Sequence, residues 1–117
     1  MDAKTFAELE DDKARTGYDL WLARRRLDMA WAIATVADRR YRRAAVASPY
    51  DFVTASIASD RATRAAWSLR GCDQFALEAA ADYARACRAV DDAAEAEREA
   101  RAVVLRKLDA LVLRTGG

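Results

Sequence analysis

Alanine is the residue that most constrains this chain, with 29 of the 117 positions spread from Ala3 to Ala110. Alanine loses no side-chain entropy in a helix, whereas the single proline, Pro49, strongly opposes one. Glycine, the next strongest opponent, stands in the interior of the chain at Gly17 and Gly71. The sequence therefore predicts an all-α fold.

The first helix is expected at about residues 5–47. Thr5 and Glu8 have the spacing of a capping box, in which each side chain bonds the backbone N–H of the other residue. Ser48 and Pro49 end this helix, and they are typical of the N-cap and the first position of a following helix. The lone proline thus predicts the first turn of the chain.

Two further helices are expected at about 49–70 and 73–114. Gly71 is typical of a helix C-cap and Asp73 of an N-cap, so a break is predicted between them. The lengths are then long, short and long, so the early half of the first helix and the late half of the third are expected to project at opposite ends. We expect one helical domain over residues 1–117, an elongated three-helix bundle that self-association completes.

The first helix has apolar residues on two faces in its middle. One stripe runs from Leu20 to Ala45, and a second contains Leu22, Met29, Ile33 and Val36. A helix that is apolar on two sides has neighbours on two sides. Within this chain the two predicted later helices are sufficient to be those neighbours.

The predicted third helix carries an apolar stripe in two parts. The first part, between Ala76 and Ala94, consists of small residues at heptad spacing, which suit close packing against another helix. Glu97 and Arg101, four residues apart and so spaced for a salt bridge, separate this first part from a second apolar part. The short middle helix is not long enough to cover both parts. We predict that this second part is an oligomer interface formed by Val104, Leu105, Leu108, Leu111 and Val112.

Arginine provides the strongest surface signal. Seven arginines stand between residues 24 and 43, against two aspartates. Guanidinium groups match phosphate oxygens, and nearby tryptophans can stack on bases, so one interpretation is nucleic-acid binding. The other is a solvated helix face, or ion pairing with protein carboxylates. The candidate residues for binding a partner or a nucleic acid are Arg24, Arg25, Arg39, Arg42, Arg43, Arg61 and Arg64.

The absence of histidine removes several kinds of chemistry: a Ser-His or Cys-His nucleophile, an imidazole acid or base, and a His-ligated metal. Cys72 and Cys87 lack CxxC spacing, so we expect free thiols in a reducing compartment, with Cys72 beside the predicted helix start at Asp73. The net charge is +1, and no apolar run approaches the length of a membrane span. We expect a cytoplasmic protein with no catalytic residue, cofactor, metal or membrane contact.

These observations favour a non-enzymatic protein-interaction module that self-associates, such as an assembly component, an adaptor or a small inhibitor. Nucleic-acid binding through the arginines of the first helix is the alternative. A weaker alternative comes from a resemblance: the helix lengths and the run Arg24-Arg25-Arg26 resemble small helical chorismate mutases. That resemblance implies intertwined dimers with an arginine-lined site for a dicarboxylate, although the family's lysine after the first helix has no counterpart in this sequence.

Overall fold

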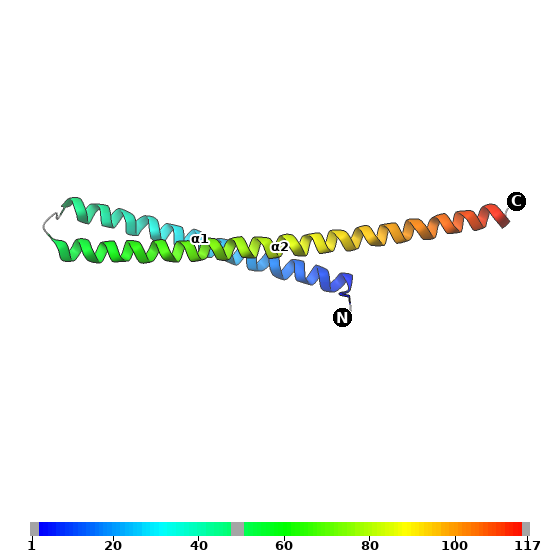
Figure 1. Cartoon of the computed structure of the whole chain (residues 1–117), viewed down its shortest axis with the longest axis horizontal. Coiled ribbons are helices and arrows are strands. Elements are labelled where there is room, and N and C mark those ends of the chain that lie inside the picture. The colour runs from blue at the N-terminus through cyan, green and yellow to red at the C-terminus, as the bar shows by residue number, and fades with distance from the viewer. Residues whose placement is uncertain (1–2, 48–50, 116–117) are drawn as a thin grey trace.

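The computed structural model describes residues 3–47 and 51–115, and it confirms the all-α class. The described residues form two helices rather than the predicted three: α1 (Phe6–Ala47, 42 residues) and α2 (Phe52–Thr115, 64 residues). The helices run antiparallel as a hairpin, and the C-terminal third of α2 extends alone (Figure 1). The molecule measures 100 × 27 × 14 Å, so it is a rod little more than one helix thick.

The break predicted at Gly71 and Asp73 is wrong, because α2 continues through both residues. Glycine in a helix interior costs only about 1 kcal/mol relative to alanine. No glycine among the described residues has the positive φ that a C-cap glycine adopts. Residues of α2 on both sides of this point, Ala65 and Ala76, are buried. A turn at Gly71 would carry one of them away from α1.

The continuous α2 corrects three further expectations. The helix lengths no longer resemble those of the three-helix mutases. The early half of α1 does not project from the molecule, since Gly17 lies directly beneath the ring of Tyr83 on α2. Cys72 lies in the interior of a long helix, so no helix N-terminus stands beside its thiol.

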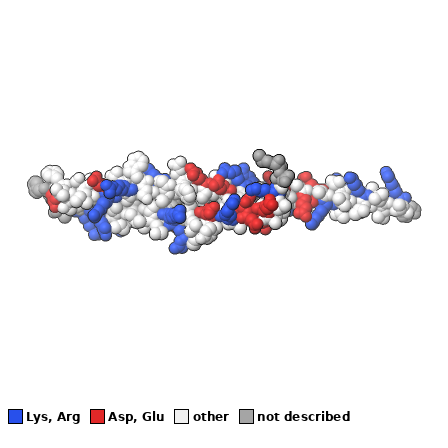
Figure 2. Space-filling view, turned by 90° about the horizontal axis from the view of Figure 1, so that it is seen from below, with Lys and Arg blue, Asp and Glu red and all other residues white. Residues whose placement is uncertain are grey.

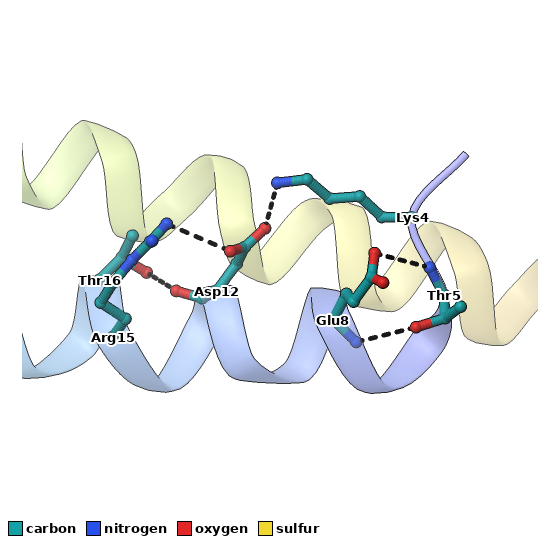
Figure 3. A network of polar contacts seen from close by, with 6 residues as sticks. All are labelled: Lys4, Thr5, Glu8, Asp12, Arg15 and Thr16. Carbon is teal, nitrogen blue, oxygen red and sulfur yellow. Dashed lines mark hydrogen bonds and ion pairs between the residues drawn. The ribbon is translucent and has the colours of Figure 1, made fainter. Parts of the chain in front are cut away.

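The start of α1 confirms the predicted capping box (Figure 3). The backbone N–H of Glu8 donates to Thr5 Oγ1 at 3.2 Å, and the N–H of Thr5 donates to Glu8 Oε2 at 3.3 Å. One turn later Asp12 accepts hydrogen bonds from Lys4 Nζ at 2.5 Å and from Arg15 at 3.1 Å. The hydrogen bond from Lys4 lowers the pKa of Asp12 below its usual value. These contacts stabilise the first two turns of the helix.

The start of α2 depends on Asp51, which acts as the N-cap. The backbone N–H of Thr54 donates to Asp51 Oδ1 at 3.0 Å, and the hydroxyl of Thr54 donates to Oδ2 at 2.6 Å. Both bonds favour the ionised carboxylate, and they lower the pKa of Asp51. The predicted cap residues Ser48 and Pro49 lie outside the described residues.

The core between the helices is thin and rich in alanine. Leu20 and Ala23 of α1 form a buried cluster with Ala76 and Ala79 of α2, and Ala23 is the least exposed at 2%. None of the large side chains among the described residues is fully buried. The stripe predicted to pack closely between positions 76 and 94 does face α1: Ala76, Ala79 and Val90 are buried, and Tyr83, Ala86, Cys87, Ala93 and Ala94 are half-buried.

Candidate functional site

The hairpin exposes far more surface than a compact protein of its size. Its accessible area is 9605 Å², whereas a compact monomer of 13.0 kDa exposes about 6,300 Å². Its radius of gyration is 27.3 Å, about twice that of a compact chain of this length. Folding therefore buries only about half of the unfolded chain's surface, less than a typical small domain buries. Two of the exposed regions are apolar.

The first apolar region lies on the arm, by which we mean residues 95–115 of α2. Every residue of the arm is exposed. At 3.6 residues per turn, positions 104, 108 and 111 lie on the same face of α2 as positions 76, 79 and 90, which pack against α1. The predicted ion pair is present in between, with Arg101 and Glu97 2.8 Å apart, and both side chains are exposed.

The arm therefore continues the packing face of α2 past the part of the hairpin that α1 covers. We predicted the oligomer interface on this segment because the short middle helix could not also cover it. In the structure the segment lies uncovered, with its five candidate residues each 51–65% exposed. These residues are Val104, Leu105, Leu108, Leu111 and Val112.

The second apolar region is a groove between α1 and α2 near the hairpin end, with a volume of about 1010 Å³. Its apolar lining includes Ile33 and Val36 of α1 and Ile57 of α2, and Ile33 is 60% exposed. Ile33 and Val36 belong to the second apolar stripe of the first helix, for which the sequence predicted a neighbour. Leu20, Ala23 and Ala30 of the other stripe are buried, whereas Met29, Ile33 and Val36 of this stripe are exposed, so this face of α1 is open at the groove.

Three arginines line the same groove: Arg40 from α1, and Arg61 and Arg64 from α2. Arg61 and Arg64 were candidates from the sequence, and the structure places both on the α2 side of the groove, opposite the lining residues of α1. Arg40 was missed among its arginine neighbours. The sequence does indicate this position, because Arg40 lies seven residues after Ile33 and four after Val36 and therefore on the same face of the helix.

The remaining candidate arginines lie outside the groove lining. Three of them are exposed near the hairpin end, where Arg42 pairs with Asp38 at 3.0 Å. The other two lie nearer the middle of α1, where Arg25 stacks over the ring of Trp21 at 5.1 Å from its centroid. The predicted arginine face is therefore divided along the rod. The residues outside the groove are Arg24, Arg25, Arg39, Arg42 and Arg43.

Charge is distributed unevenly along the rod. The hairpin end, residues 31–47 and 51–70, carries seven arginines and three carboxylates. The middle, residues 6–30 and 71–94, carries eleven carboxylates and seven basic groups. On the face shown in Figure 2, the carboxylates gather over the middle of the molecule. The groove therefore lies in the most positive part of a chain whose net charge is only +1.

Two further properties of the described residues bear on function. They bring together no group of three or more His, Cys, Asp or Glu side chains that would hold a metal ion. Neither α1 nor α2 contains a stretch that is long and apolar enough to cross a membrane. A comparison with protein-family models found no match, and comparisons with curated proteins and with solved structures found none.

Proposed function

We propose that the chain is a non-enzymatic, cytoplasmic protein-interaction module that self-associates through the arm. The observation that carries this proposal is the continuous face of α2. That face packs against α1 up to Ala94. Beyond the exposed Glu97–Arg101 ion pair it is apolar again from Val104 to Val112, about 12 Å along the helix, with no neighbour among the described residues. Apolar stripes of this kind are normally buried against another helix.

A second copy of the chain fits this surface because the spacing of the apolar residues is symmetric about Leu108. A twofold contact needs a patch that is complementary to itself. Antiparallel pairing about Leu108 brings Lys107 of one copy opposite Asp109 of the other, so that unlike charges flank the centre. The same pairing sets Val104 against Val112 and Leu105 against Leu111.

Replacing Leu108 and Leu111 together with Glu tests the arm as an interface. We expect the wild-type chain to be at least a dimer at micromolar concentration and the double variant to be a monomer. Each leucine is about half exposed, and pairing would bury this exposed half. That burial contributes about 1 kcal/mol of association free energy per side chain. Four leucines per dimer then contribute about 4 kcal/mol, roughly a thousandfold in Kd. Sedimentation equilibrium measures this change.

The variant Ala102→Glu/Ala110→Glu is the matched control. It adds the same charge to the arm away from the apolar stripe, so it should remain a dimer. Circular dichroism should show that both variants stay helical, because no residue of the arm belongs to the buried core. A wild-type chain that sediments as a folded monomer at micromolar concentration contradicts the proposal.

Nucleic-acid binding is a second candidate, and the charge of the hairpin end favours it. Seven arginines against three carboxylates give this third of the rod a positive field. The exposed Arg39 and Arg43 lie in this region without a carboxylate within ion-pair distance among the described residues. Binding of this kind depends steeply on salt, which separates it from apolar association.

A further inference from the structure

We propose that the groove binds an amphipathic helix of another protein, one whose apolar stripe is flanked by Asp and Glu residues. The inference rests on the proposed function as a protein-interaction module. It does not depend on self-association, because the groove and the arm lie at opposite ends of the rod (Figure 1).

The lining of the groove has the form of a site for a third helix. On α1 the lining residues run from Ala32 to Ala44, and on α2 from Thr54 to Ala65, and on each helix single residues or adjacent pairs recur at every turn along one face. Two such rows side by side are what a helix pair presents to another helix that packs on it. Five lining residues are alanines, which allow a close approach of the bound backbone. The rows are about 18 Å long, enough for a helix of about twelve residues.

The arginines specify the flanks of that helix. Arg40, Arg61 and Arg64 have no carboxylate within 4.0 Å among the described residues, although other arginines of the chain do. Carboxylates beside the apolar stripe of a bound helix would form charge-assisted hydrogen bonds with these guanidinium groups. The charge of the groove thus complements an acidic amphipathic helix.

The two other occupants suit the groove less well. The arm of a second copy carries three basic residues and one acidic residue between positions 103 and 115, so its charge has the same sign as that of the groove. A nucleic-acid backbone would engage the arginines but leave Ile33, Val36 and Ile57 uncovered. The lining combines apolar and basic groups, and an acidic amphipathic helix satisfies both.

The probe is a phage-displayed library of peptides about 16 residues long, selected on the wild-type chain and counter-selected on Arg61→Glu/Arg64→Glu. We expect enrichment of sequences with apolar residues at helical spacing and acidic residues beside them. The affinity of a selected, labelled peptide is then measured by fluorescence anisotropy. Arg61→Glu/Arg64→Glu and, separately, Ile57→Gln should each weaken binding by about tenfold or more.

Three controls make the result specific to the groove. Arg39→Glu/Arg43→Glu makes the same charge change at the same end of the rod, and at physiological ionic strength it should alter affinity by less than about threefold. A peptide with Lys in place of its acidic flanks should bind the Arg61→Glu/Arg64→Glu chain better than the wild type. Leu108→Glu/Leu111→Glu should bind the selected peptide as the wild type does, which separates this inference from self-association.

Several outcomes overturn the inference. One is a selection that enriches no acidic amphipathic sequence. Another is peptide binding that survives Ile57→Gln, which would leave charge alone as its cause. A third is tight binding of labelled RNA or duplex DNA that Ile57→Gln leaves unchanged and Arg61→Glu/Arg64→Glu abolishes, since this assigns the groove to phosphate groups.

Discussion

Replacing Gly71 with alanine distinguishes a continuous α2 from a helix that ends at this residue. In the structure Gly71 lies in the helix interior, and apart from its chain neighbours and the local helix backbone no heavy atom comes within 4 Å of the position where a Cβ would be. Alanine therefore fits without displacing anything, and it is favoured over glycine by about 1 kcal/mol in a helix. We expect Gly71→Ala to raise the free energy of unfolding by about that amount.

The effect is large enough to measure. Unfolding entropy is about 2.1 cal/mol/K per residue, so 1 kcal/mol corresponds to about 4 °C in Tm for a chain of 117 residues. If Gly71 instead capped a helix at positive φ, alanine there would cost about 1 kcal/mol or more and Tm would fall. Thermal unfolding followed by circular dichroism reports the sign, at equal protein concentrations because self-association also raises Tm.

Gly17→Ala is the matched comparison. The same gain in helix propensity applies at this position, but a Cβ there would lie 3.1 Å from Cε2 of Tyr83, so the ring must move. We expect Gly17→Ala to stabilise the chain less than Gly71→Ala, or to destabilise it. A fall in Tm for Gly71→Ala would refute the continuous helix and support the three-helix arrangement.

Two further predictions concern charge. If the hairpin end binds nucleic acid, changing Arg39, Arg42 and Arg43 together to Gln should abolish binding at low salt and leave helicity intact. A titration against mixed DNA and RNA measures this binding. Absence of binding by the wild-type chain at low salt would contradict a nucleic-acid function. The carboxyl groups of Asp12 and Asp51 have folded-state pKa values below their ordinary 3.8, so their stabilisation is present above about pH 4 and is lost as pH falls through the lowered values. Carboxyl NMR titrations should give midpoints below 3.8, and midpoints at or above that value count against the hydrogen bonds that Lys4 donates to Asp12 and Thr54 to Asp51.

Much of the secondary structure was predictable because its causes are local. The capping box at Thr5 and Glu8 depends on residues three apart, and the helix it begins has the predicted extent. The face of α2 toward α1 was predictable from the heptad spacing between Ala76 and Ala94. The uncovered arm also follows from this spacing, since positions 104–112 continue the same stripe.

The groove was only partly predictable. Arg61 and Arg64 stood out in the sequence, but Arg40 and Ile57 did not, because a groove depends on which faces of two distant helices come together. The second apolar stripe of the first helix predicted a neighbour, and the structure leaves its Ile33 and Val36 open at this groove. At the groove the stripe is therefore an exposed surface among the described residues rather than part of the core.

The helical character of the chain follows from its composition alone, because alanine is abundant and only one proline interrupts it. The composition also excludes histidine-based chemistry. The path of the chain at Gly71 and Asp73 was not predictable from composition, because a glycine in a continuous helix and a capped break differ by only about 1 kcal/mol in local preference. Such a small difference is outweighed by packing, because α1 runs uninterrupted past this point and buries alanines of α2 on both sides of it.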